Sequence, residues 1–535
     1  MKRNKIFALA FGCIALCSLP ACQEDANDWG FDEEHNRLFR STNFELVKEE
    51  PTSVLLSFKG VSNATKYIFD FSQGDSLLFD NIVSTRELLA DTMTAYRQDV
   101  SAVNTEYRML FDNLNGTTRY SVRMKAVDEK NGMESGYSQL FFITPDEQIF
   151  TKVTPGTTIA SLKWKADKEA TTIKYAKLEG ENKVDTTWFE PHTLTAAEKA
   201  AGTWTIEGLT LGTKYLAQIF NGEVRRGSYP FTTLGAKNGT LIEVQPSDNI
   251  NEVLAAASGE VTLSFMGGET YTVGGRLNIP ATVSSLYLAG NAKDGVLPKF
   301  LIGDISLAGP MERFAVQYLE FAGDNAGFMT NLSGVNIFKN ASFEGCYIHD
   351  IRNCLVRIST NDADVETIEV KDCILERIST SGWGIFNLKT RSFKKLSMTN
   401  STLVDISDQI CDVSIAIDEV EFTNLTHVNY IKMDKWLRFN KQPKGITVTG
   451  VIFAGDMGGG KMNSGYGDYA GWLNFAGCYL TSDFTVNKRP FNDAKILNIT
   501  TDELFVDPKN GDFHFRPEAK FEGDGKVGDP RWWTE

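Results

Sequence analysis

The stretch Phe343-Glu-Gly-Cys346-Tyr-Ile348 decides the fold of the C-terminal half of the chain, because its pattern of two apolar clusters around a small residue recurs there. Clear copies lie at 370–375, 398–403 and 475–480, and looser copies at 283–288, 316–321, 417–422 and 448–453. The fourth positions of successive copies are Leu286, Leu319, Cys346, Cys373, Ser401, Val420, Val451 and Cys478. They are separated by 33, 27, 27, 28, 19, 31 and 27 residues. A repeat of this length predicts a solenoid.

The repeats are built from strands. Their apolar runs are short and β-branched and end at Gly, Asn or Asp, which is typical of strands rather than helices. One coil cannot bury its apolar face alone, so stacked coils must form the core. We expect a right-handed parallel β-helix of roughly seven or more coils, with Cys346, Cys373, Ser401 and Cys478 pointing inward in one ladder. The step of 19 indicates a short coil or a misassigned copy, and a β-sandwich with coincidental spacing is the alternative.

Length and charge limit the function. A chain of 535 residues has room for roughly three to four domains. Its formal net charge of −15 argues against a general nucleic-acid-binding protein, which needs a basic face to replace counterions. We therefore expect no nucleic acid as a partner. An acidic ligand is still compatible with this composition, because a local basic strip can exist on an acidic protein.

The N-terminus has the pattern of an export signal. A basic start at residues 2–5 precedes an apolar run at 6–19, which is too short to span a membrane. The following Leu19-Pro20-Ala21-Cys22 resembles a bacterial lipobox, which implies a signal peptide at 1–21 and a lipid-modified Cys22, with an ordinary signal peptide as the alternative. The mature protein would then be anchored to a membrane without spanning it.

Acidic residues follow the lipobox directly. Glu24 and Asp25 resemble the export tag of Bacteroidetes-type lipoproteins that face outward from the outer membrane. This resemblance implies an outer-membrane location, facing the extracellular side. The acidic segment 22–40 has little periodicity and is expected to be a tether.

Five cysteines remain after Cys22 in the sequence. They form no Cys-x-x-Cys pair and five cannot all be paired, so a disulfide framework or a structural zinc site is not expected. We expect them to be free and buried, with a Cys346–Cys373 bridge across adjacent coils as the alternative.

Two segments between the tether and the solenoid resemble fibronectin type III domains. Leu114-Asn-Gly-Thr-Thr-Arg-Tyr120 is similar to the corner of that family in which a buried Tyr hydroxyl bonds to the backbone, and Leu209-Thr-Leu-Gly-Thr-Lys-Tyr215 repeats it. The predicted sandwiches occupy 41–146 and 147–234 and have the character of a spacer. A short helix is expected at 84–90.

The segment 240–535 resembles pectate-lyase-like β-helices. It opens with an expected helical cap at 250–257, and closes with a Gly- and Asp-rich segment in which Trp532 and Trp533 are expected to cap the solenoid. The predicted fold class is therefore all-β, with two fibronectin type III-like β-sandwiches followed by a right-handed parallel β-helix. The resemblance implies either a polysaccharide lyase or a non-catalytic carbohydrate-binding protein of a glycan-uptake system.

A candidate ligand strip follows from aligning three strand segments on their inward apolar residues. The alignment makes Arg357, Asn387 and Lys432 point outward at equivalent places, with Lys389 two residues along the same face. Cations on strands about 4.8 Å apart would suit an extended anionic glycan. Ordinary solvated charges are the alternative. Further cations in this region are Arg352, Arg377, Arg391, Lys394 and Lys395.

Aromatic residues could supply stacking surfaces for sugar rings. Trp383 lies in a glycine-flanked turn, Trp436 follows Lys432, and Tyr466 and Tyr469 belong to a glycine-rich loop that could cover a groove. The alternating carboxylates Asp362, Asp364 and Glu366 are a weak candidate calcium site, and a solvated loop is the competing interpretation.

Together these features predict a surface lipoprotein that binds polysaccharide, with an acidic, pectin-like glycan as the expected ligand. The expected partners are the polysaccharide, the outer membrane through the lipid anchor, and an outer-membrane glycan transporter. A uronate-specific polysaccharide lyase using calcium is the first alternative, although no catalytic residue can be assigned. A structural surface protein or adhesin is the second.

Overall fold

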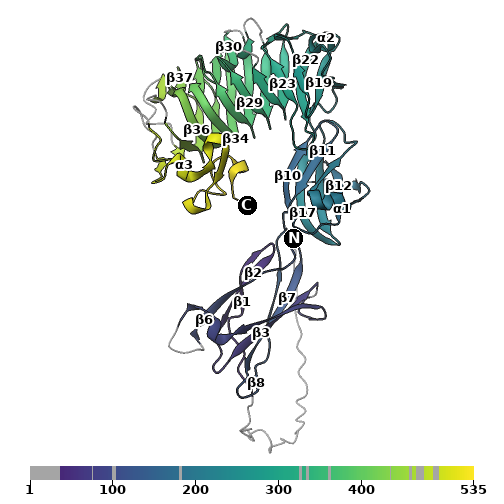
Figure 1. Ribbon diagram of the computed structural model, residues 1–535, viewed down its shortest axis with the longest axis vertical. Helices are drawn as coiled ribbons and strands as arrows, with labels where there is room; N and C mark the ends of the chain where they lie inside the picture. The colour runs from purple at the N-terminus through teal and green to yellow at the C-terminus, as the bar shows by residue number, and fades with distance from the viewer. Residues whose placement is uncertain are drawn as a thin grey trace, which may run out of the picture. The chain divides into compact units, whose positions relative to one another are not determined.

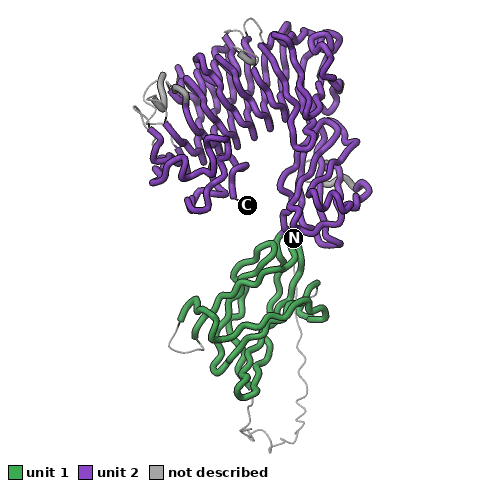
Figure 2. The backbone as a smooth tube through the Cα atoms, viewed as in Figure 1, with its two compact units in different colours: residues 1–145 green, residues 146–535 purple. Residues whose placement is uncertain are grey.

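The computed structural model is built almost entirely from β-strands (Figure 1). It describes residues 37–74, 76–98, 104–179, 183–323, 328–332, 337–359, 363–433, 435–456, 461–465, 475–485 and 493–534. The chain forms two compact units, Met1–Pro145 and Asp146–Glu535 (Figure 2). The lipobox-like segment and the expected export tag, with Cys22, Glu24 and Asp25, lie outside the described residues. The predicted all-β class, with sandwiches followed by a parallel solenoid, is confirmed.

The first unit is an antiparallel β-sandwich of the fibronectin type III-like kind. One sheet has the order β1-β2-β6-β5 and the other β4-β3-β7-β8, with β9 also pairing with β7. Tyr120 is buried, and its hydroxyl accepts a hydrogen bond of 2.9 Å from the backbone N–H of Asn115, as the predicted corner requires. The strands are β1 (Glu45–Glu50), β2 (Ser53–Lys59), β3 (Lys66–Gln73), β4 (Ile82–Leu89), β5 (Ala95–Arg97), β6 (Glu106–Phe111), β7 (Arg119–Asp128), β8 (Met133–Glu134) and β9 (Ser138–Ile143).

The helix expected at 84–90 is wrong. Residues 82–89 form β4, which pairs antiparallel with β3, and only a 3₁₀ turn follows at Ala90–Thr92. The β-branched residues Ile82, Val83 and Thr85 favour a strand, and β4 pairs with β3 along nearly its whole length.

The second sandwich opens the second unit. Its sheets have the orders β10-β11-β15 and β13-β12-β16-β17, with β14 also pairing with β12. Tyr215 repeats the corner, because its buried hydroxyl accepts a hydrogen bond of 2.9 Å from the backbone N–H of Thr210. The elements are β10 (Phe150–Pro155), β11 (Ala160–Trp164), β12 (Thr172–Glu179), β13 (Lys183–Trp188), β14 (His192–Thr193), α1 (Ala196–Ala201), β15 (Thr203–Ile206), β16 (Lys214–Asn221) and β17 (Val224–Thr232).

The rest of the second unit is a parallel solenoid whose coils contribute up to three strands each. First and second strands form an 18-stranded sheet, which begins at β18 (Thr240–Glu243), and third strands form a separate eight-stranded sheet. The first strands are β19 (Gly259–Met266), β22 (Val283–Asn291), β25 (Met311–Gln317), β28 (Phe338–Glu344), β31 (Asp364–Lys371), β38 (Gly445–Thr449) and β41 (Phe475–Ala476). The second strands are β20 (Thr270–Thr272), β23 (Lys299–Ile302), β26 (Glu320–Gly323), β29 (Tyr347–Ile351), β32 (Ile374–Ile378), β39 (Ile452–Ala454), β42 (Tyr479–Leu480) and β43 (Lys495–Ile496).

Two long strands, β34 (Ser392–Asp408) and β36 (Glu419–Met433), run through both the first and the second positions of their coils. The third strands are β21 (Arg276–Ile279), β24 (Asp304–Leu307), β27 (Phe328–Leu332), β30 (Cys354–Ser359), β33 (Phe386–Lys389), β35 (Cys411–Val413), β37 (Lys435–Phe439) and β40 (Lys461–Gly465). The expected coil number is confirmed by these eight third strands.

The predicted inward ladder is present. Cys346, Cys373, Ser401 and Cys478 are all buried. The backbone N–H of Cys346 lies 3.4 Å from Cys373 Sγ, and that of Cys373 donates to Ser401 Oγ at 3.1 Å, so these residues stack on successive coils. The five cysteines are free and buried, as expected.

Two members of the proposed repeat were misassigned. Val420 pairs with Leu396 and therefore belongs to the first-strand row, whereas Ser401 pairs with Leu425. Leu286 lies in the same first-strand row, because it pairs with Phe314. With Leu425 in place of Val420, the steps from Leu319 onward become 27, 27, 28, 24, 26 and 27, and the short coil disappears.

A helix covers the first coil of the solenoid, and the C-terminal segment covers one side of it. The expected helix is α2 (Ile250–Ala255), which buries Ile250 and Leu254 against the first coil. The C-terminal segment contains α3 (Thr501–Leu504), β44 (Phe505–Asp507), β45 (Asp512–Phe515) and η6 (Pro530–Trp532). It packs on the outer side of the second strands, where Trp532 Nε1 donates a hydrogen bond of 2.7 Å to Thr402 Oγ1. The expectation that Trp532 and Trp533 cap the end of the solenoid is therefore wrong, because they lie against its side. In the described part of the chain, no helix combines the length and apolar character required to cross a membrane.

A buried carboxylate fastens this C-terminal segment and predicts a pH effect. Asp529 accepts from Thr402 at 2.7 Å and pairs with Arg531 at 2.7 Å, and burial raises its pKa to about 6. Because the folded protein holds this proton more tightly than the unfolded chain, whose Asp pKa is about 3.9, the group stabilises the fold below about pH 4 and loses that contribution as pH rises through 6. We expect the unfolding free energy of Asp529→Asn, compared with that of the parent, to rise by about 2–3 kcal/mol as the pH increases from about 4 to about 7. Urea unfolding of both proteins at each pH measures this difference. Parallel pH profiles of the two proteins would contradict this.

Candidate functional site

An outward row of polar residues crosses the third-strand sheet. Arg357 on β30 and Asn387 on β33 are register partners, so these two predicted residues do lie side by side. The row runs through Asn331, Arg357, Asn387, Asp412 and Arg438. Figure 1 shows β30 and β37 of this sheet along the same side of the solenoid.

Arg357 is held by two neighbours. Its Nη1 donates a hydrogen bond of 2.8 Å to Asn331 Oδ1, one strand back. Its guanidinium carbon lies 4.8 Å from the centre of the Trp383 ring. A guanidinium above an indole ring is attracted by the negative face of the ring, so this contact orients both groups.

Trp383 is presented by a turn between β32 and β33. The residue has a left-handed backbone with φ of 90°, flanked by Gly382 and Gly384, and 47% of it is exposed. The backbone N–H of Trp383 donates a hydrogen bond of 2.8 Å to Asp408 Oδ2 on the next coil. A strained turn held from the neighbouring coil therefore fixes a half-exposed ring beside Arg357.

The far half of the row is charge-compensated. Arg438 Nη1 donates to Asp412 Oδ2 at 3.1 Å. Burial raises the pKa of Asp412 although Arg438 opposes the shift. An anionic ligand would therefore meet positive charge at Arg357 and an ion pair two strands further on.

The structure places Lys389, but not Lys432, in the strip predicted from the sequence. Lys389 is exposed and pairs in register with Ser359, two residues along from Asn387, and it has no ion pair in the described part of the chain. Lys432 is wrongly placed in the predicted strip. Its strand β36 belongs to the 18-stranded sheet, where Lys432 pairs with Ser407, and Arg438 takes the aligned position in the third-strand sheet.

Trp436 is also wrong as a ligand-binding candidate. It is 1% exposed and packs inside the coil against Phe422, Phe453 and Phe475. Its Nε1 donates to His427 Nδ1 at 3.3 Å, and burial lowers the pKa of His427 to about 3, so the imidazole stays neutral and can accept. This indole belongs to the core. Tyr466 and Tyr469 lie outside the described residues.

The candidate calcium ligands are engaged by cations. Asp364 binds Arg391 and accepts from Ser392 at 2.6 Å, and the Arg391 and Ser392 hydrogen bonds lower its pKa to about 2. Glu366 accepts from Lys394 at 2.9 Å. Asp362 lies outside the described residues. Within the described ranges no three His, Cys, Asp or Glu side chains group as metal ligands, and calcium at Asp364 and Glu366 would have to displace two ion pairs.

The same cross-coil pairing neutralises most cations of the solenoid. Four of the cations noted in the sequence pair with carboxylates about one coil away: Arg377 with Asp350, Arg391 with Asp364, Lys394 with Glu366, and Lys395 with Glu419 and Glu421. On the third-strand sheet, Arg357 contacts the Trp383 ring and Lys389 lies on β33, the strand that follows the Trp383 turn.

Sequence reasoning missed three members of the row, Asn331, Asp412 and Arg438. The signal was available, because successive members of the row are 25 to 30 residues apart, about one coil. It was obscured because the third strand after β36 begins only at Lys435, beyond the segment used in the alignment.

No protein-family model and no curated protein matches the chain. Among solved structures, it is similar to a two-domain fibronectin type III segment of chicken tenascin, with 13% identity over 36% of this chain and 98% of that one, and a TM-score of 0.23. The FN1–FN3 domains of chicken CNTN1 match with 12% identity over 39% and 70% of the two chains, and a TM-score of 0.17. The fold of this chain places it in a class that joins fibronectin type III-like sandwiches to a parallel β-solenoid.

Proposed function

We propose that this protein is a lipid-anchored outer-membrane protein that binds an acidic, pectin-like polysaccharide at the cell surface and belongs to a glycan-uptake system with an outer-membrane transporter. The observation that carries the binding proposal is the half-exposed Trp383 ring, fixed by its turn and paired with Arg357. The lipobox and acidic tag around Cys22 support the location.

The chemistry of the face suits a uronate chain. The apolar face of a pyranose ring stacks on an indole, and neighbouring polar groups bind its hydroxyls. Arg357 and Lys389 are on adjacent strands about 4.8 Å apart and are offset along them, so they could bind carboxylates of one extended chain. Asn331, one strand back from Arg357, and Asn387, on the same strand as Lys389, supply amides beside them.

The double variant Arg357→Ala, Lys389→Ala tests the anionic part of this proposal. It removes two charge-assisted contacts, each about 1.5–3 kcal/mol when formed in a buried setting and less at an exposed one. We expect affinity for oligogalacturonate, measured by calorimetry, to fall roughly ten- to hundredfold, and parental binding to weaken with salt. Lys394→Ala is the matched control, because this exposed cation lies on another strand row and pairs with Glu366. Equal affinity of the double variant and the parent for each acidic glycan tested would refute the site.

Trp383→Ala should weaken the same binding by about tenfold with little dependence on salt, because stacking is not ionic. Its melting temperature should stay close to that of the parent, since the ring is not part of the core. Following unsaturated uronate products in the same incubations, with calcium present, separates binding from the lyase alternative.

A further inference from the structure

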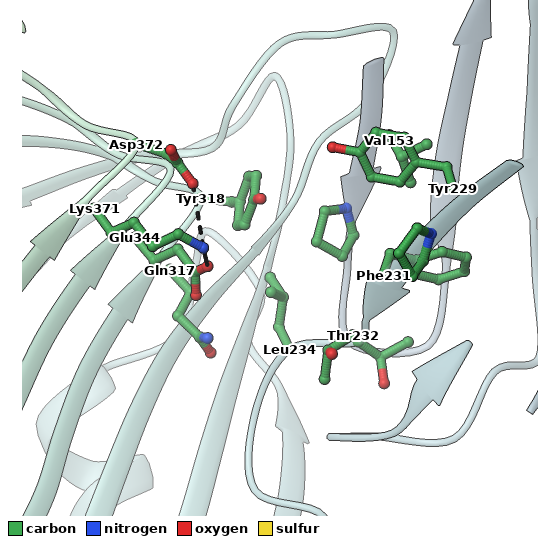
Figure 3. Close-up of a pocket in the computed structure, with 13 residues that line it drawn as sticks. Val153, Tyr229, Phe231, Thr232, Leu234, Gln317, Tyr318, Glu344, Lys371 and Asp372 are labelled. Carbon is green, nitrogen blue, oxygen red and sulfur yellow. Dashed lines mark hydrogen bonds and ion pairs between the residues drawn. The ribbon is translucent and has the colours of Figure 1, made fainter. Parts of the chain in front are cut away.

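A polar cavity lies within the second unit, and Trp383 is not among the residues that line it (Figure 3). One wall is formed by β10 and β17 of the sandwich, and the other by the turns after β25, β28 and β31 of the solenoid. Its volume is about 290 Å³, close to the lower end of the range of about 300–1,000 Å³ that holds small molecules. It therefore has room for a small polar ligand.

Hydrogen bonds join the second sandwich and the linker to the solenoid. The backbone N–H of Thr157 donates to Asn291 Oδ1 at 2.7 Å, and Asn291 Nδ2 donates to Ser264 Oγ at 2.8 Å. The backbone N–H of Gly235 donates to Gln317 Oε1 at 3.1 Å. Because these bonds join sandwich and linker to solenoid, the cavity is a fixed feature of the unit.

Tyr318 stands out in the solenoid wall. In each coil from β25 onward, the residue at the turn between first and second strands has a left-handed backbone. Its occupants further along are Gly345, Asp372, Asn400, Asn424, Gly450 and Gly477, the types that tolerate this conformation. Tyr318 is the exception, with φ of 52°. A bulky residue held there costs free energy, and such strain persists mainly where a side chain has a function.

The surroundings make room for this tyrosine. A Cβ at Gly345 would lie 2.7 Å from the Tyr318 ring, and one at Gly290 would collide with the Tyr318 carbonyl oxygen. Figure 3 shows the Tyr318 ring between the two walls, with Tyr229 of β17 on the opposite side. Tyr229 is 37% exposed, so the cavity has an accessible aromatic surface as well as the Tyr318 ring.

The charged groups of the cavity are arranged around one lysine. Lys371 Nζ lies 3.2 Å from Glu344 and 3.5 Å from Asp372 (Figure 3). The two carboxylates are thereby held in place, with acceptor capacity left over for hydroxyl donors. Burial, and then the charges of Glu344 and Asp372, raise the pKa of Tyr318, so its phenol remains a neutral donor and acceptor. Two carboxylates against one engaged ammonium disfavour an anion.

We propose that this cavity binds one neutral sugar residue of a glycan, a subsite that rests on the proposed function but has the opposite charge preference from the Trp383 face. Tyrosine rings supply the surface for the C–H face of a pyranose or furanose. Glu344, Asp372 and Lys371 supply acceptors and a donor for its hydroxyls. A branched glycan with an acidic backbone and neutral side chains would engage both places.

Tyr318→Asn tests the subsite, because asparagine tolerates the left-handed turn and removes the ring. The probes are galacto-, arabino-, xylo-, manno- and gluco-oligosaccharides, with oligogalacturonate as the acidic comparison, all measured by calorimetry on the full chain. We expect the parent to bind at least one neutral probe and Tyr318→Asn to lower that affinity at least about tenfold, the loss of roughly one stacking contact. Asn400→Gly, at the equivalent turn three coils on, is the matched control and should bind as the parent does.

The two proposals fail separately. The subsite would be overturned if Tyr318→Asn bound every neutral probe as tightly as the parent does. It would also be overturned if the parent bound none of the neutral probes. Loss of oligogalacturonate binding in Tyr318→Asn would also overturn it, because the cavity would then take the acidic chain. If oligogalacturonate binding is lost in the Arg357, Lys389 double variant but kept in Tyr318→Asn, the result supports the Trp383 face. The neutral probes then decide whether the cavity is a subsite. A melting temperature of Tyr318→Asn at or above the parental value excludes misfolding as the cause.

Discussion

Trp436→Ala should destabilise the solenoid by about 3–5 kcal/mol, the usual cost of truncating a fully buried aromatic side chain. The indole is 1% exposed and its ring centre lies 5.2 Å from that of Phe453 and 5.5 Å from that of Phe422. Its removal also leaves His427 Nδ1 without the donor at 3.3 Å, in a place where burial already keeps the imidazole neutral. Chemical denaturation of the parent and the variant measures this loss.

The matched control is Trp383→Ala, which removes the same side chain from a half-exposed turn. Its stability should change by less than about 1 kcal/mol, because a surface substitution leaves no cavity. The Trp436 substitution should therefore lower stability, whereas the Trp383 substitution should weaken glycan binding and leave stability nearly unchanged. If Trp436→Ala melts with the parent but loses glycan binding, the indole is a ligand contact and its placement in the core is wrong.

The sequence carries the fold well because the solenoid repeats one physical requirement in every coil. A small inward residue is needed where the strands turn. The small residues Cys346, Cys373, Ser401 and Cys478 at this repeat position therefore predict the buried ladder directly. The two tyrosine corners are equally local, since Tyr120 and Tyr215 bond to backbone five residues away. Short-range patterns of this kind can be recognised in the sequence without knowledge of the three-dimensional structure.

The candidate site was harder to predict because it depends on register across loops of unequal length. The long strand β36 runs through two positions of its coil, which moved Lys432 out of the third-strand sheet and placed Trp436 inside. Apolar alternation alone cannot show that shift, because both registers place apolar residues inward. The contact of Arg357 with Trp383 was likewise hidden, since the residues lie on different elements joined by a turn.

The cavity at Tyr318 lay beyond sequence reasoning for a different reason. Its two walls come from segments more than 80 residues apart in the sequence, and no local pattern shows that Tyr229 faces the solenoid. What the sequence does contain is the anomaly itself. Once the repeat is aligned, a tyrosine occupies a turn position that is otherwise Gly, Asp or Asn. Departures from a repeat are thus useful places to look for ligand contacts.

Cys22→Ala should release the protein from the membrane fraction. The apolar segment at 6–19 is too short to span a bilayer, so after export a lipid on Cys22 would be what holds the chain to the membrane. We expect nearly all of the parent in the membrane fraction and nearly all of the variant in the soluble fraction after cell disruption. Replacing Cys346, which is buried in the solenoid ladder, with alanine is the matched control and should leave the protein membrane-bound. A Cys22→Ala protein that stays with the membrane would show that another feature anchors it.

Replacing both Glu24 and Asp25 with neutral residues should separate anchoring from orientation. If these two carboxylates act as an export tag, the variant keeps its lipid and its membrane association but faces the periplasm. Protease added to whole cells should then digest the parent and spare the variant, whereas both should be digested once the outer membrane is permeabilised. Substituting Glu33 and Glu34, two further acidic residues of the same tether, controls for general loss of charge and should leave the protein accessible. Equal digestion of the Glu24, Asp25 variant and the parent in whole cells would refute the tag. The same protein would then reach the surface by a signal that lies elsewhere in the chain.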